Sequence, residues 1–249
     1  MGLTIHYTLH APAIFSFNDA RTLITQLQTF AKKLPIKTCT KIITYKDGKD
    51  DPRFGDFRSY LLMLPHAEND ENPPHLFVRP LELVEFDLHQ PGSESAAFGL
   101  ARYAATASAE RFNIKDHPTN LTGWRWSVFC KTQYASLEKE GGFPNFFAIH
   151  DGICQVLDQA KRLGIETDVT DESEYFTHRD KAKLEAEINK WNRMVAAVAG
   201  TLKDACKDRP DAIASPITDT PEFERLEAQG QEFAAKARGL KDIIDHDLK

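Results

Sequence analysis

Cysteine is scarce in this sequence and forms no paired motif. The 249 residues include four cysteines, and no two of them form CxxC: Cys39, Cys130, Cys154 and Cys206. Disulfide frameworks and structural zinc sites depend on such spacings, so we expect reduced thiols in a cytoplasmic protein. No predicted helix carries HxxxH, and HExxH does not occur. We therefore predict no metal ion and no cofactor.

Long apolar runs and clusters of basic residues are also missing. No stretch approaches the roughly 20 apolar residues that a membrane span needs. The first residues lack the basic region and apolar stretch of a signal peptide. The 31 basic residues are scattered among 37 acidic ones, for a net charge of −6. Nucleic-acid binding depends on gathered Lys and Arg side chains, so we expect neither nucleic acid nor membrane as a partner.

What is present is the composition of a soluble globular protein and a readable order of elements. Hydrophobic residues make up 41% and charged residues 27%, which fits one large domain or two small ones. Alternation predicts strands, and apolar stripes of period 3.6 predict helices. The expected strands are 3–10, 39–45, 81–89, 96–103, 124–134 and 165–171. The expected helices are 18–34, capped by Asn18 and ended by Pro35, and 145–163, ended by Gly164. Residues 104–122 are expected to be irregular.

The C-terminal quarter predicts two further helices. Thr177-x-x-Asp180 resembles a capping box, and apolar residues recur behind it at steps of three and four as far as Leu202. Thr220-Pro221 then predicts the start of a last helix. The fold class is thus α+β: a mainly antiparallel sheet, packing helices on its apolar face and a C-terminal helical pair. We expect a sheet domain at 1–176 and a docked helical segment at 177–249, with a single domain as the alternative.

The hairpin LELVEFDLHQPGSESAAFGLARY at 81–103 carries the main functional hint. Pairing its apolar residues sets Val84, Phe86 and Leu88 beside Ala96, Phe98 and Leu100. Glu85, Asp87 and His89 then share the opposite face with alanines and Gly99. Small neighbours leave room above the sheet, which indicates a groove.

Electrostatics extends this row into a predicted site. Glu85 and Asp87 lie roughly 7 Å apart along a strand, so a covered face would require protonation or a cation. Arg125 and Lys131 on strand 124–134 are the natural cations, and His6 lies on the polar side of the first strand. The candidate catalytic residues are Glu85, Asp87 and His89. The candidate ligand-binding residues are His6, Tyr103, Arg125 and Lys131.

Three functions fit this pattern. The leading one is a binding module that holds a small molecule or a protein on the polar sheet face. The second is a hydrolase in which Asp87 or Glu85 is the general base and His89 or His6 is the acid or a metal ligand. The third is an assembly protein that forms a homodimer through its C-terminal helices. A solvated face without function is the competing interpretation. His150, on an apolar helix stripe, is predicted to be a hydrogen-bonded core histidine.

Overall fold

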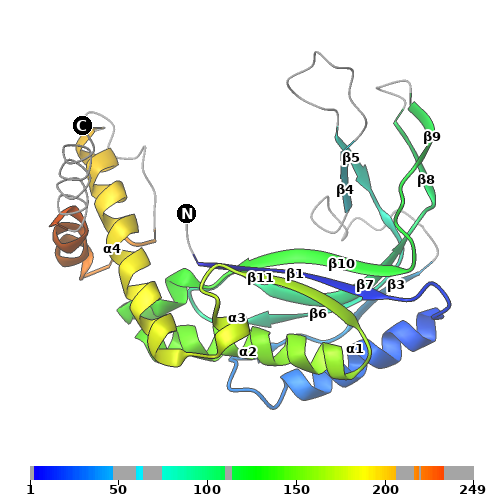
Figure 1. Ribbon diagram of the computed structural model, residues 1–249, viewed down its shortest axis with the longest axis horizontal. Coiled ribbons are helices and arrows are strands. Elements are labelled where there is room, and N and C mark those ends of the chain that lie inside the picture. Colours follow the sequence, from blue (N-terminus) through cyan, green and yellow to red (C-terminus); the bar gives the residue numbers. More distant parts are fainter. Residues whose placement is uncertain are drawn as a thin grey trace, which may run out of the picture.

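The computed structural model describes residues 3–46, 60–63, 75–109, 114–205, 216–218 and 220–232 (Figure 1). The strands are β1 (Thr4–Ala11), β2 (Thr38–Cys39), β3 (Ile43–Lys46), β4 (Tyr60–Met63), β5 (His75–Val78), β6 (Pro80–His89), β7 (Ala96–Tyr103), β8 (Thr106–Ala109), β9 (Ile114–Pro118), β10 (Trp124–Lys131) and β11 (Glu166–Asp171). The α-helices are α1 (Phe17–Ala31), α2 (Gly142–Arg162), α3 (Tyr175–His178) and α4 (Lys181–Ala205). Two short 3-10 turns, η3 (Gln133–Ser136) and η4 (Glu138–Glu140), precede α2.

One antiparallel sheet forms the body. Among the described residues it has seven strands in the order β11-β1-β10-β7-β6-β2, and β3 also pairs with β6. Each neighbouring pair runs antiparallel. The helix α2 connects β10 to β11, and these two strands lie on either side of β1. The predicted class, α+β with a mainly antiparallel sheet, is confirmed.

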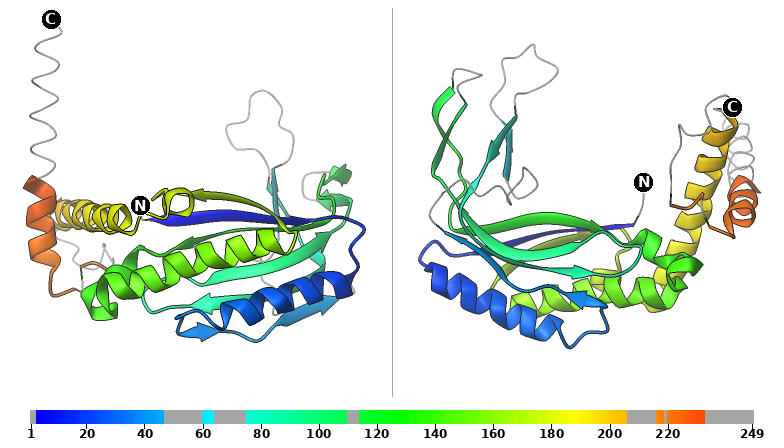
Figure 2. Two further views of the ribbon diagram at one scale, coloured as in Figure 1. Left: turned by 60° about the horizontal axis from the view of Figure 1, so that its bottom comes forward. Right: turned by 180° about the vertical axis from the view of Figure 1, so that it is seen from behind.

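The helices α1 and α2 cover one face of the sheet, as Figure 2 shows from two sides. Alternate residues of β1 point toward them, so Ile5 and Leu9 are fully buried and share a core with Ile24 of α1 and Ile153 of α2. Apolar residues that recur every 2 positions in the strand and about every 3.6 positions in the helices thus form one apolar layer. The predicted packing of helices on the apolar face is confirmed.

The observed elements differ from the prediction at several points. Helix α1 is capped by Ser16, whose hydroxyl accepts from the Asp19 N–H while Asp19 accepts from the Ser16 N–H; Asn18 is inside the helix. The predicted strand 39–45 is two short strands, β2 and β3. The stretch 104–122, expected to be irregular, contains the hairpin β8–β9. Gly164 ends α2 with a φ of +82°, as predicted.

The C-terminal helices pack closely on each other. Asp180 caps α4 by accepting from the Lys183 N–H, so the predicted capping box beginning at Thr177 is wrong. Leu184 and Ile188 of α4 belong to the main core, whereas Ala196, Ala199 and Leu137 form a second cluster with Ile217 and Phe223. Residues 223–232 are helical. The division into domains 1–176 and 177–249 stays a prediction.

The face of the sheet opposite α1 and α2 lies between elements that project from its two ends. The hairpins β4–β5 and β8–β9 rise at one end of the sheet, and α4 rises on the same side at the other end (Figures 1 and 2). No helix in the described ranges is both long and apolar enough to cross a bilayer.

Candidate functional site

The predicted register of the 81–103 hairpin is confirmed. Val84 pairs with Leu100 and Phe86 with Phe98, so both pairs face the helices. Glu85 pairs with Gly99 and Asp87 with Ala97 on the opposite face. The polar side chains therefore do share the face that lies between the hairpins and α4.

Half of this face is covered. Over β6 and β7, Leu83 and Ala101 have no exposed surface, and Glu85 is only 2% exposed. Val78 of β5 is buried in the same core cluster, and half-buried Tyr45 of β3, which pairs with Leu83, packs against that cluster. The row that the sequence suggested as an open groove is thus interior at Glu85. Glu82, which the sequence analysis did not single out, is also buried and pairs with Arg102 at 2.7 Å.

The predicted site residues do not form one constellation. Asp87 is half-buried, Tyr103 is buried, and His89 is exposed at the end of β6. Arg125 lies opposite His10 and Ala101, at the other end of the face from Lys131. In the part of the chain that the structure describes, neither Arg125 nor Lys131 forms an ion pair with Glu85 or Asp87.

The other half of the face is open and slightly hollowed. A hollow of about 200 Å³ lies over β11, β1 and β10, and its lining residues are His6, Tyr7, Thr8, Ser127, Val128, Phe129, Asp168 and Thr170. Of the seven predicted site residues, only His6 lines it. On its lining the His6 ring lies against Phe129, with ring centroids 5.6 Å apart. Phe129 is 52% exposed, which is unusual for an aromatic ring in the middle of a strand.

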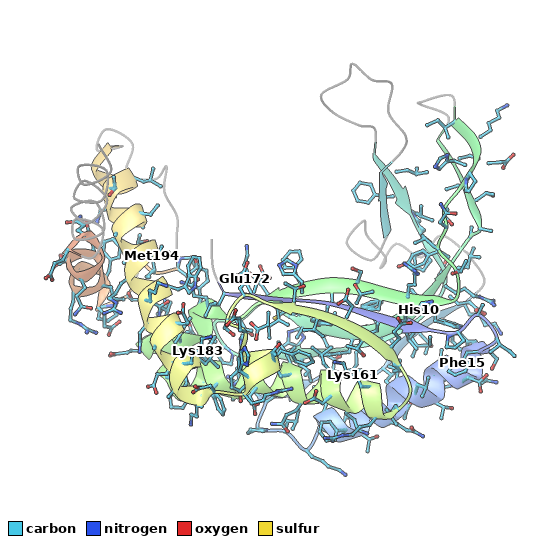
Figure 3. All side chains as sticks on the ribbon, viewed as in Figure 1. His10, Phe15, Lys161, Glu172, Lys183 and Met194 are labelled. Carbon is cyan, nitrogen blue, oxygen red and sulfur yellow. The ribbon has the colours of Figure 1, made fainter. Side chains whose placement is uncertain are left out.

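Polar residues surround this aromatic pair. Glu172 at one end of the open half accepts a hydrogen bond from the Thr4 N–H, and His10 at the other end pairs with Glu166 at 3.2 Å (Figure 3). Asp168 and Ser127 lie between these ends. The open half therefore combines an exposed aromatic ring with surrounding polar and acidic side chains.

A second polar group lies in the interior, where β10, α2 and β11 meet. The His150 ring is fully buried and has a partner at each nitrogen. Its Nδ1 lies 2.9 Å from the Thr132 hydroxyl, and its Nε2 lies 3.3 Å from Asp171 Oδ2 and 3.1 Å from Ser173 Oγ. We call Thr132, His150, Asp171 and Ser173 the buried polar centre. The predicted hydrogen-bonded core histidine is confirmed.

The Asp171 carboxylate is the most strongly held group of this centre. It also accepts from the Ser173 N–H, the Ser173 hydroxyl and the Phe176 N–H at 2.8 to 2.9 Å. Burial alone would raise its pKa, but the hydrogen bond and charge of His150 and the two backbone N–H groups outweigh burial and lower the pKa to about 2. Nearby, burial raises the pKa of the Cys154 thiol well above its usual range.

A nucleophile, a histidine and an aspartate in one chain of hydrogen bonds resemble a catalytic triad. However, Thr132 and His150 have no exposed surface, so a substrate cannot reach the hydroxyl in this conformation. Their arrangement instead ties the end of β11 and the start of α3 to α2. The sequence did contain a signal for this centre. Thr132, His150 and Asp171 each lie on the apolar side of the strand or helix that the sequence predicts for them.

Comparison with known protein families, with curated proteins and with solved structures finds no match.

Proposed function

We propose that this protein is a binding protein, and that it receives a protein partner on the open half of its sheet face. The observation that carries the proposal is Phe129, an exposed aromatic ring that lies against the tilted ring of His6 among polar residues. Protein interfaces place aromatic side chains at a desolvated centre and polar groups at the rim. The polar side chains of Asp168, Glu166 and His10 supply such a rim. As the sequence predicts, we assign this function to the cytoplasm.

The dimensions favour a protein over a small molecule. Small-molecule sites usually enclose about 300–1,000 Å³, and the hollow here is about 200 Å³ and shallow. Three strands of 6 to 8 residues present roughly 350 Å². A standard interface buries about 800 Å² on each partner. We therefore infer that α4 and the two hairpins contribute the remaining contact area on either side of the sheet.

A photo-crosslinking amino acid in place of Phe129 tests the proposal. The same group in place of Ile14, which is 87% exposed in the loop after β1, is the matched control. In cells that express the full chain, we expect position 129 to crosslink to a defined protein that position 14 does not capture. Adding Ser127→Arg, which places a bulky charge beside the hollow, should abolish this crosslink without changing the melting temperature. Equal capture at both positions would contradict the proposal.

The assembly alternative retains one supporting observation. Val198 and Leu202, four residues apart on α4, are 41% and 48% exposed. A second copy of the chain that covered this pair would form the predicted homodimer. Light scattering of the wild type and of Leu202→Glu measures this directly. A monomer mass for both proteins would eliminate the homodimer.

The hydrolase alternative has less support. Glu85, Asp87 and His89 differ in burial from 2% exposed to open, and none of them lines the hollow. A general base and a general acid must both reach one substrate. A hydrolase with Glu85 or Asp87 as the general base and His89 as the acid therefore stays a hypothesis from the sequence.

A further inference from the structure

The buried polar centre adjoins an unused set of metal-ligand atoms. Donor atoms of His150, Cys154 and Asp171 all lie within 4.8 Å of one another. His150 and Cys154 are four residues apart on α2, so they project from the same side of the helix. Asp171 approaches from the end of β11. His150 and Cys154 have no exposed surface, and the Asp171 side chain is 2% exposed.

We propose that His150, Cys154 and Asp171 bind a zinc ion. One imidazole nitrogen, one thiolate and one carboxylate are ligand types that zinc accepts. A thiolate and a carboxylate neutralise the two charges of the ion, and a neutral site is the form that a fully buried position tolerates. Binding releases the thiol proton of Cys154 to solvent.

The distance between His150 and Asp171 fits this assignment. Nε2 and Oδ2 are 3.3 Å apart, which is long for a charge-assisted hydrogen bond of about 2.7–2.9 Å. Two donors at about 2.05 Å from zinc and at a tetrahedral angle lie roughly 3.3 Å from each other. Ser173 Oγ, 3.1 Å from Nε2, is the neighbouring oxygen for a fourth position.

The surrounding contacts also match those of metal ligands. A histidine that binds zinc through one nitrogen usually donates its other N–H to an oxygen. Here Nδ1 faces the Thr132 hydroxyl at 2.9 Å, which leaves Nε2 for the ion. The Ser173 and Phe176 N–H groups orient the Asp171 carboxylate.

Of the three proposed zinc ligands, Cys154 alone takes no part in the hydrogen bonds of the buried polar centre. Cys130, also fully buried, donates to the Glu94 carbonyl oxygen at 3.3 Å. Within the ranges that the structure covers, the Cys154 thiol makes no such bond. Because it lies one helical turn from His150 and beside Asp171, a metal ion would give it a partner.

Zinc titration of the full chain tests the proposal. The chain is first stripped with a chelator, and Zn²⁺ is then added both to the folded protein and during refolding, so that slow entry into a buried site is not read as no binding. Competition with a chromophoric chelator gives the stoichiometry and affinity. Co²⁺ in place of Zn²⁺ reports the thiolate through its sulfur-to-cobalt charge-transfer absorption. Cys154→Ser and Cys154→Ala are the test variants, and Cys130→Ser is the control with an equally buried thiol.

We expect one zinc ion per chain, a higher melting temperature with zinc, and the cobalt–thiolate absorption in the wild type and in Cys130→Ser. Both Cys154 variants should lose the absorption and bind zinc at least about 100-fold more weakly. Thr132→Val, which removes only the oxygen behind His150, should weaken binding by about 10–100-fold. The proposal is overturned if the wild type binds no stoichiometric zinc by either route, or if the folded Cys154 variants bind it as tightly as the wild type.

Discussion

The hydroxyl of Tyr7 donates a hydrogen bond to the carbonyl oxygen of Ala97, 2.8 Å away and across the width of β10. The indole N–H of Trp126 donates to the same oxygen at 2.9 Å. The strands β10 and β7 pair at Arg125 and Ala101, and beyond that point side-chain donors take the place of the ladder at Ala97. Two core side chains thus satisfy a backbone group where the sheet opens.

This arrangement predicts a moderate loss on removing the Tyr7 hydroxyl. Tyr7→Phe should lower the free energy of unfolding by about 0.5–1.5 kcal/mol, because Trp126 still satisfies Ala97. Tyr134→Phe is the control, since no hydrogen bond of the Tyr134 hydroxyl exists among the described residues. Urea denaturation measures both. Equal stability of the two variants would show that the Tyr7 bond is not formed in solution.

In the buried polar centre, replacing the Asp171 carboxylate by an amide is expected to lower the stability of the protein strongly. Asp171→Asn removes the charge opposite His150 and should cost roughly 3 kcal/mol, because an uncompensated polar group then stays buried. Asp168→Asn on the exposed side of the same strand should change stability by less than about 0.5 kcal/mol. Both are measured by urea denaturation with a chelator present, so that the difference belongs to the protein groups alone. Similar values for the two variants would refute a buried role for Asp171.

Two glycines predict opposite outcomes for the same substitution. A methyl group at Gly230 would overlap the backbone carbonyl of Arg193, whereas one at Gly200 would meet only the flexible end of Glu227. Gly230→Ala should therefore destabilise the helix pair by about 1–3 kcal/mol. Gly200→Ala should be neutral or stabilising, because alanine is the better helix former. Thermal unfolding of both variants decides, and the reverse order would mean that the two helices do not pack as described.

The cap of α1 predicts a local pH dependence. Hydrogen bonds from the Ser16 hydroxyl and then from the Ser16 N–H lower the pKa of Asp19 from its ordinary value of 3.8. A pKa lowered by folding means that the charged group stabilises the fold above about pH 3.8. That contribution is lost as the pH falls through the folded-state pKa. In Ser16→Ala the N–H remains, so the Asp19 pKa should rise toward 3.8 without reaching it. NMR titration of the carboxyl carbon measures this, and an unchanged pKa would exclude the hydroxyl as its cause.

Local patterns carried most of the fold. Alternation in β1 and β6 identified which residues face the core, and the wrong register would have exposed Val84, Phe86 and Leu88 together. The stripes of α1 and α2 identified the helices that cover them. The errors lie at ends and short elements, such as the cap at Ser16 and the hairpin β8–β9, where few residues carry the signal.

The candidate site required contacts that no local pattern contains. Alternation placed Glu85 on the polar face correctly, but that face is buried at Glu85 and open at Phe129. Which half is covered depends on side chains of other strands, including Val78 of β5 and Tyr45 of β3. The alternation of a strand shows on which face of the sheet a side chain lies, but it does not show whether another element covers that face.

The sequence by itself therefore determined the class of fold, the hairpin register and the core-facing side of each long element, because these follow from the periods of single segments. Only the tertiary structure decided that Thr132, His150 and Asp171 meet, since His150 lies 18 positions from Thr132 and 21 positions from Asp171 in the sequence. It likewise decided that His6 and Phe129 share an open surface. Both groupings depend on how separate strands and a helix pack together, and that packing is a property of the whole folded chain.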